Sequence, residues 1–364
     1  MRDGGINARV DHLRIHRLRL PLRQPYKLSF GPVEAFDTIL VELEMNGRRG
    51  FGDATVLTGY TEETIEGAWS LACRLAPRLA GCQAPTLWAE TEPHLAEAPF
   101  TVTAFRTAAE MALGHRILKS PAERQVPLLK ILNADTEPDI VAEVEAGLAA
   151  GYGTFKIKVG FDLEPDLARV AFIQHVVAGR AALTIDANQG YTTADGCAFA
   201  ARVGTESVLF FEQACDKHDW EAAVAVARAA RTPVMLDEQI YDLEDVRQAA
   251  ALAAAGFVKL KLMKMGGLEA LIDGIAATAA LGLSPVLGNG VATDIGCWME
   301  ACVAAGRIRT AGEMNGFLKP VRPIVRNPMP VRDGALIVPA NYWPEIDPDA
   351  VAAFALDSVV PELA

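Results

Sequence analysis

Short apolar runs recur along the second half of the chain, and each is followed by a stretch rich in alanine. Eight of these runs are predicted as strands, at residues 126–132, 154–159, 182–187, 208–213, 233–238, 257–262, 284–289 and 308–313. Strands that alternate with helical segments at this spacing form parallel βα units. The pattern predicts a closed (β/α)8 barrel, a modified TIM barrel, over residues 124–320. An open doubly wound sheet is the alternative, but it requires a glycine-rich turn after its first strand, and none is visible.

The first third of the chain has a different pattern. Residues 9–45 alternate apolar and charged positions and end at Asn46–Gly47, which predicts antiparallel strands joined by a tight turn. Helices are expected in segments 60–81, with Thr61 as the N-cap, and 100–118. We predict an α+β capping domain over residues 1–123. Residues 321–364 are expected to contain a strand near 334–340 and to pack back on this domain.

Composition narrows the class of protein. The chain has 364 residues, 51% hydrophobic, and a net charge of −12, which argues against nucleic acid as a partner. No apolar run reaches the ~18 residues of a membrane span, and no basic-then-apolar signal pattern is seen at the N-terminus. The six cysteines lack disulfide or zinc spacing and are expected to be buried free thiols. We expect a cytoplasmic homo-oligomer that acts on a small molecule.

Three consecutive predicted strands end in a carboxylate: Asp186, Glu212 and Asp237. The carboxyl ends of barrel strands meet around the active site, so these side chains are expected to converge. Because three converging anions repel one another, they take up a proton or recruit a cation. Hard oxygen ligands from separate strands suit Mg²⁺, and we predict a magnesium site there.

Lysines stand on the strands to either side of these acids. Lys156 and Lys158 share one face of their strand, as do Lys259 and Lys261 on theirs. Burying an ammonium group is costly unless another charge neutralises it. A bound dication and an anionic substrate would balance these lysines and acids. Lys264, beyond the strand, is expected on the surface or in a loop.

Together these segments resemble the muconate lactonizing enzyme subgroup of the enolase superfamily. The matching motifs are KIK at 156–158, DAN at 186–188, FEQ at 211–213, LDE at 236–238 and KLMKMGG at 261–267. The last motif looks most like those of dipeptide epimerases. The resemblance implies that Asp186, Glu212 and Asp237 bind Mg²⁺. It implies that Lys158, with Lys156 beside it, and Lys261 are the acid/base lysines. Asn188 and Glu238 are implied as residues that support them.

Lys259 is expected to point inward one layer deeper than Lys261 and to pair with Asp237 or Glu238. The alternative, that Lys259 is the base and Lys261 is structural, stays open. Another branch of the superfamily carries a histidine at the end of the seventh barrel strand. Segment 284–296 contains no histidine, so a His–Asp base is excluded.

The resemblance implies Mg²⁺-dependent removal of a proton α to a carboxylate, through an enediolate. Two lysines that face each other across one carbon permit racemisation or epimerisation, and an amino-acid derivative or dipeptide is the expected substrate. The same lysines also permit the reaction of a cycloisomerase or dehydratase, of the muconate lactonizing, o-succinylbenzoate synthase or hydroxyproline dehydratase type. A Schiff-base lyase and a non-catalytic barrel are the remaining alternatives.

Substrate specificity in this family depends on two cap loops, here 23–36 and 53–64, and on the ends of the last two barrel strands. Dipeptide epimerases carry Asp-x-Asp at the eighth strand, where this chain has Glu313-Met314-Asn315. The departure weakens the case for a dipeptide, although Glu313 could still bind a cation. The candidate substrate-binding residues are Tyr26, Lys27, Ser29, Tyr60, Asn289, Glu313 and Asn315.

Overall fold

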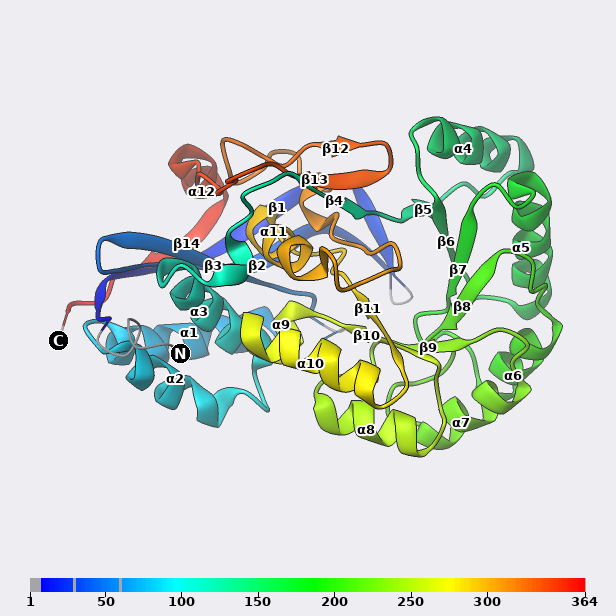
Figure 1. Cartoon of the computed structure of the whole chain (residues 1–364), viewed down its shortest axis with the longest axis horizontal. Helices are drawn as coiled ribbons and strands as arrows, with labels where there is room; N and C mark the ends of the chain where they lie inside the picture. Colours follow the sequence, from blue (N-terminus) through cyan, green and yellow to red (C-terminus); the bar gives the residue numbers. More distant parts are fainter. Residues whose placement is uncertain (1–7, 29–30, 59–60, 364) are drawn as a thin grey trace.

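The structure, a computed structural model, describes residues 8–28, 31–58 and 61–363. A curled parallel sheet with helices outside it lies beside a region built from an antiparallel sheet and three helices (Figure 1). The seven parallel strands are hydrogen-bonded in the order β11-β10-β9-β8-β7-β6-β5. Their bounds are β5 Lys130–Leu132, β6 Thr154–Lys158, β7 Ala182–Asp186, β8 Val208–Glu212, β9 Val234–Leu236, β10 Phe257–Leu260 and β11 Ser284–Leu287.

A helix follows every one of these strands, as predicted. The helices are α4 Glu137–Ala149, α5 Leu163–Val177, α6 Thr193–Arg202, α7 Trp220–Ala229, α8 Leu243–Ala251, α10 Leu268–Ala280 and α11 Asp294–Ala304. A short helix, α9 (Leu262–Met265), comes directly after β10. In the described part of the chain, no helix is long and apolar enough to cross a membrane.

The eighth predicted strand, at 308–313, does not form as a regular strand. Only one isolated parallel bridge, between Leu128 and Gly312, is found there among the described residues. The Leu129 N–H donates to the Gly312 carbonyl at 3.0 Å, and the Gly312 N–H donates to the Pro127 carbonyl at 3.0 Å. On its other side, Gly312 lies so close to β11 that an added Cβ would be 2.3 Å from the Leu287 carbonyl oxygen. Close backbone packing, rather than a full ladder, closes the barrel.

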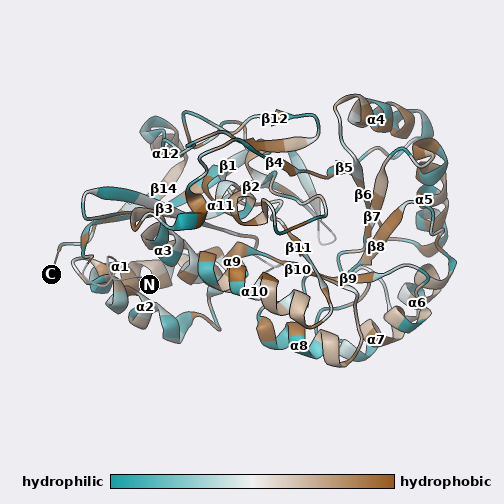
Figure 2. Cartoon of the chain, viewed as in Figure 1, coloured by the Kyte–Doolittle hydropathy of each residue, from teal (hydrophilic) through white to brown (hydrophobic). Residues whose placement is uncertain are grey.

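Hydrophobic residues make up much of β7 and β8, whereas the helices outside them carry many hydrophilic residues (Figure 2). The two faces of a barrel strand also differ in chemistry. Phe155 of β6 is fully buried against α4, where a Cβ on Gly147 would be 2.4 Å from its ring. Lys156, its neighbour, points to the barrel interior because side chains alternate along a strand. Deeper inside the barrel, Phe210, Met235 and Val286 form a separate apolar cluster that fills the space beneath the charged layer.

The capping region contains β1 (Val10–Leu28), β2 (Gly31–Met45) and β3 (Arg48–Val56), with the predicted turn at Asn46–Gly47. Its helices are α1 (Ile65–Leu79), α2 (Ala84–Thr91), which was not predicted, and α3 (Pro99–Ala112). The N-cap of α1 is Thr64 and not Thr61, because the Thr64 side chain accepts from the Gly67 N–H. The Thr61 hydroxyl instead donates to backbone carbonyls.

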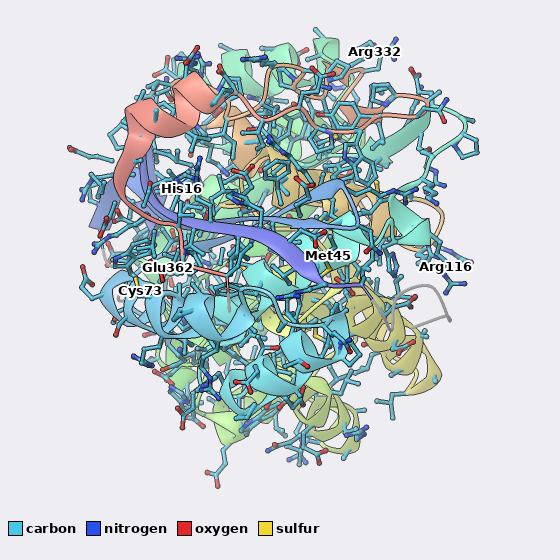
Figure 3. The ribbon with its side chains drawn as sticks, turned by 90° about the vertical axis from the view of Figure 1, so that its left-hand side faces the viewer. His16, Met45, Cys73, Arg116, Arg332 and Glu362 are labelled. Carbon is cyan, nitrogen blue, oxygen red and sulfur yellow. The ribbon has the colours of Figure 1, made fainter. Side chains whose placement is uncertain are left out.

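The C-terminal segment joins both parts of the molecule. Its strand β13 (Ala335–Val338) pairs with β4 (Arg124–Pro127) and with β12 (Val331–Arg332), whereas β14 (Ala355–Val359) pairs with β1. Helix α12 (Pro348–Phe354) stands between these strands in sequence. In Figure 3 the strand that carries His16 lies beside the last strand, and the His16 Nδ1 is 2.8 Å from the Ser358 hydroxyl. Strand β14 of the tail thus lies against β1 of the cap, and β13 lies against β4.

All six cysteines are free thiols. Three of them, Cys215, Cys297 and Cys302, are buried as predicted. The prediction was wrong for Cys73, Cys82 and Cys197, which are only partly buried.

The close approach at Gly312 gives a stability prediction. Gly312→Ala is expected to destabilise the fold by about 2 kcal/mol, because the new methyl group overlaps backbone atoms of β11 that have little room to move. Gly153→Ala is the matched control, since nothing lies within 4 Å of a Cβ at that glycine. Thermal unfolding of both variants checks this; equal midpoints would contradict the proposed closure.

Candidate active site

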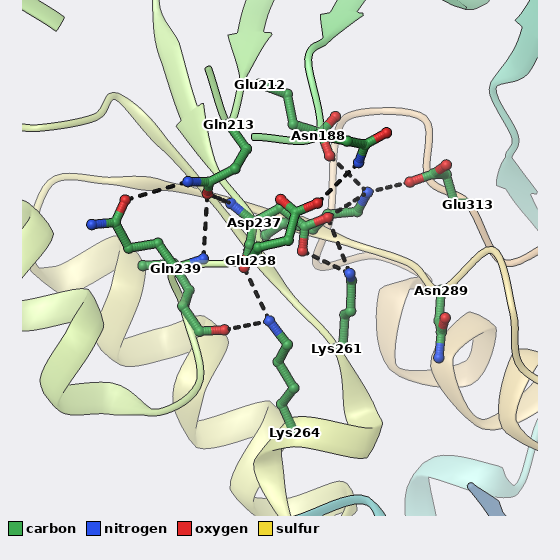
Figure 4. Close-up of polar contacts among 12 residues, drawn as sticks. Asn188, Glu212, Gln213, Asp237, Glu238, Gln239, Lys261, Lys264, Asn289 and Glu313 are labelled. Atoms are coloured by element: carbon green, nitrogen blue, oxygen red, sulfur yellow. Dashed lines mark hydrogen bonds and ion pairs between the residues drawn. The ribbon is translucent and has the colours of Figure 1, made fainter. Parts of the chain in front are cut away.

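Acidic and basic side chains lie close together at the mouth of the barrel, among them Glu212, Asp237, Glu313 and Lys261 (Figure 4). The Lys156 Nζ, from β6, is 2.7 Å from an Asp186 oxygen of β7 and 2.8 Å from a Glu212 oxygen of β8. It also donates to Glu313 at 3.1 Å. Lys156 is 1% exposed, so its charge is balanced entirely by these buried carboxylates.

Lys158 lies one layer nearer to the solvent. Its Nζ is 2.6 Å from Asp186 Oδ2 and donates to Asn188 Oδ1 at 2.5 Å. The Asn188 amide in turn donates to Glu238 at 2.9 Å. Asn188 and Glu238, predicted as supporting residues, thus form a chain of contacts that holds the Lys158 ammonium at the barrel mouth.

The other lysine pair occupies the opposite end of the row of acids. The Lys261 Nζ, just after β10, is 2.7 Å from Asp237 Oδ1. Lys259 lies deeper, 3.1 Å from Glu212 Oε1 and 3.5 Å from Asp237 Oδ2, and it also forms an ion pair with Glu313. Along the strands the order is therefore lysine, three acids, lysine, as the sequence predicts.

These contacts govern protonation. Burial disfavours the ammonium forms of Lys156 and Lys259, but the surrounding carboxylates outweigh it and hold both pKa values well above the ordinary range. Burial also disfavours the ammonium form of Lys158, but the negative charge of Asp186 outweighs this effect and the pKa of Lys158 is raised. Burial together with the charge of Asp186 raises the pKa of Glu212 to about 7.

The residues present fit a divalent metal by chemistry. Asp186, Glu212 and Asp237 offer carboxylate oxygens from three adjacent strands, which is the hard donor set that Mg²⁺ prefers. Lysine ammonium groups share these oxygens. Within residues 8–28, 31–58 and 61–363, the acids, histidines and cysteines form no group of three or more arranged to hold a metal ion. A bound ion would therefore require the acids and ammonium groups to move relative to one another.

Lys264 is not the surface lysine that was predicted. It is 7% exposed, and its Nζ donates to the backbone carbonyls of Asp237 at 3.0 Å and Ile240 at 2.7 Å. It also lies 4.3 Å from the centre of the Tyr241 ring, a cation–π distance. The short helix α9 turns the chain back toward β9 and so buries Lys264, which holds the backbone that follows Asp237.

Two further residues position the site and were not predicted. Gln213 Oε1 accepts from the backbone N–H groups of Asp237 at 3.0 Å and Gln239 at 3.3 Å. Glu300, on α11, accepts from the Leu262 N–H at 2.8 Å, next to Lys261. Gln213 stands in the FEQ motif and could have been found there, whereas Glu300 comes from a helix distant in sequence and gives no signal.

A cavity of about 680 Å³ opens beside Lys158, among the loops that follow β5 and β6. Tyr26 and Asn315, two predicted substrate-binding residues, line it, together with Lys319, whose Nζ lies 4.7 Å from the Tyr26 ring centre. A smaller cavity of about 40 Å³ lies between Lys158 and Lys261.

The remaining predicted substrate residues differ in position. Asn289 borders the small cavity, and its amide donates to the Met263 sulfur at 2.6 Å. Glu313 also borders it, but its Oε2 is shared by Lys156 and Lys259. Ser29, Tyr60 and the Lys27 side chain lie outside the described part of the structure.

Comparison with known proteins gives a consistent picture. The family model described as "Enolase C-terminal domain-like" matches residues 139–342. The N-succinyl-L-Arg/Lys racemase of Bacillus cereus is 25% identical, over 85% of this chain and 88% of that protein. The hydrophobic dipeptide epimerase of Enterococcus faecalis is 26% identical, over 80% and 83%. In fold, the chain is similar to a muconate lactonizing enzyme from Pseudomonas fluorescens complexed with muconolactone, with a TM-score of 0.85, 24% identity and coverage of 96% and 99%.

Glu300 gives a pH-dependent prediction. Burial raises the pKa of Glu300 from 4.5 to about 7. Between these two pH values the folded protein holds a proton that the unfolded chain has lost. The contribution of Glu300 to the free energy of unfolding therefore falls by about 3 kcal/mol as pH rises from about 4.5 to 7.

Glu300→Gln keeps the acceptor for Leu262 and removes the charge. We expect this variant to melt above the wild type at pH 8 and close to it at pH 5, with exposed Glu206→Gln as the control. A difference in melting temperature that stays the same at both pH values would show that Glu300 does not titrate in this way.

Proposed function

This chain belongs to the Enolase C-terminal domain-like family. We propose that it is a member of the muconate lactonizing enzyme subgroup and a Mg²⁺-dependent racemase or epimerase of a carboxylate substrate. It is an enzyme of the enolase superfamily. One observation carries the proposed reaction: Lys158 and Lys261, from opposite ends of the row of acids, border the same small cavity. A substrate α-carbon between them would expose one face to each amine.

In the proposed reaction, one of these two lysines removes the α-proton, and the other returns a proton to the opposite face. Asp186, Glu212 and Asp237 would hold the metal. When bound, Mg²⁺ would stabilise the negative charge that develops on the substrate carboxylate. Asn188 keeps the Lys158 amine directed at the cavity. Which lysine acts first depends on the configuration of the substrate.

A general base has to be neutral before it accepts a proton. Without a metal, the charge of Asp186 favours the ammonium form of Lys158 and raises its pKa. Binding of a dication to Asp186 would cancel this effect and favour the neutral amine. We therefore expect Lys158 to become a base only in the metal-bound enzyme.

Glu313 supports an N-acylated amino acid as the substrate rather than a dipeptide with a free ammonium group. Its charge is already balanced by Lys156 and Lys259, and its neighbour Asn315 is neutral. Neither residue therefore offers an unbalanced charge to a substrate cation. The racemase relative named above acts, by its name, on an N-acylated amino acid. A cytoplasmic location and a homo-oligomeric state stay predictions from the sequence.

The proposal predicts α-proton exchange with solvent. In D₂O with Mg²⁺, NMR of N-succinyl and N-acetyl amino acids is expected to show deuterium at Cα in both configurations. Lys158→Ala and Lys261→Ala should each lower epimerisation at least ~100-fold. Each variant should keep exchange for the one configuration that its remaining lysine can reach. Exposed Lys119→Ala is the control.

Other outcomes would replace the proposal. Loss of water or ring closure in the wild type would identify a dehydratase or cycloisomerase that uses the same lysines. Activity that survives EDTA, with a keto substrate trapped by borohydride, would identify a Schiff-base enzyme. No exchange with dipeptides, N-acyl amino acids or proline derivatives would contradict epimerisation.

A further inference from the structure

Lys259 is a buried cation that the proposed proton transfer does not use. Its Nζ contacts Glu212 at 3.1 Å and Asp237 at 3.5 Å, which are two of the three proposed metal ligands. The Lys259 side chain is 4% exposed, compared with 18% for Lys158 and 12% for Lys261. Although Lys259 also borders the small cavity, its ammonium group is in contact with these carboxylates, so it acts first on the acids.

The charges of the whole cluster balance without a metal when every carboxyl and amine is counted in its ionised form. Four carboxylates and four ammonium groups are joined by ion pairs of 3.5 Å or less: Asp186, Glu212, Asp237 and Glu313, with Lys156, Lys158, Lys259 and Lys261. A dication that enters this group raises its net charge from zero to +2. Without Lys259 and Glu313, three carboxylates and three ammonium groups would remain, and their charges would still balance. Lys259 and Glu313 therefore form an additional ion pair beneath the other six residues.

This additional pair has opposite effects on a metal. Lys259 repels a cation held by Glu212 and Asp237, whereas Glu313 attracts it. Lys259 contacts two of the proposed ligands directly, whereas Glu313 is joined to the ligands through the ammonium groups of Lys156 and Lys259. Repulsion from Lys259 is therefore expected to outweigh attraction from Glu313. Removal of one member of a buried ion pair leaves the other uncompensated, so the two residues should be tested together.

We propose that Lys259 is a positioning residue that acts as a built-in cation: it orders Glu212 and Asp237 in the absence of metal and weakens Mg²⁺ binding. This inference rests on the proposed function, since it takes these acids as metal ligands. The enzyme would stay folded without Mg²⁺ and bind the ion reversibly. Its metal site would then respond to the concentration of free Mg²⁺ instead of being permanently filled.

Calorimetric titration with Mg²⁺ alone, without substrate, tests this. The proteins are the wild type, Lys259→Met, Glu313→Gln, the double variant and the control Lys119→Met. Lys259→Met is expected to bind Mg²⁺ at least tenfold more tightly than the wild type, and Glu313→Gln more weakly. The double variant should lie between them, near the wild type. In melting experiments, Lys259→Met should be the least stable protein without metal and should gain the most from Mg²⁺.

Equal Mg²⁺ affinity in all five proteins, or weaker binding by Lys259→Met, would overturn the inference and leave the proposed function standing. Absence of binding in every protein would also overturn it. If Lys259→Met does not fold, the comparison of Glu313→Gln with the double variant isolates the same charge, and equal affinities would again overturn it. A failure of the proposed function would instead appear as absent α-proton exchange, which these titrations do not involve.

Discussion

Buried charge has to be balanced, and this constraint organises the mouth of the barrel. Removing one partner of a buried ion pair costs about 3–5 kcal/mol, because the other charge is left without compensation. Here each proposed metal ligand contacts at least one ammonium group. The ion pairs between these acids and lysines thus stabilise the cluster. Any metal or substrate that binds there has to replace contacts that already exist.

The fold makes this cluster possible because successive side chains of a strand point to opposite faces. On β6 the apolar side chains pack outward on the helices and the lysines point inward, and neighbouring strands place Asp186 and Glu212 at the same level. Phe210, Met235 and Val286 form a separate buried apolar cluster. The tail is fixed to the cap through the pairing of β14 with β1. The reactive groups therefore sit on rigid strand ends, whereas the larger cavity is bordered by loops.

Much of this could be predicted because the information is local. Alternation within KIK and the repeated strand–helix spacing predict both the barrel and the layer of charges. Long-range contacts could not be predicted in the same way. The burial of Lys264 depends on the turn of α9, the weak eighth strand depends on the approach of Gly312 to β11, and the role of Glu300 depends on a helix outside every motif. Pairing of Lys259 with an acid was expected, but its contact with Glu313 joins two positions distant in sequence.

A crystal structure with Mg²⁺ and an N-succinyl amino acid tests the central claim most directly. The account predicts one metal bound by oxygens of Asp186, Glu212 and Asp237, with the substrate α-carbon between the Nζ atoms of Lys158 and Lys261. A metal held elsewhere, or both amines on the same face of the α-carbon, would contradict it.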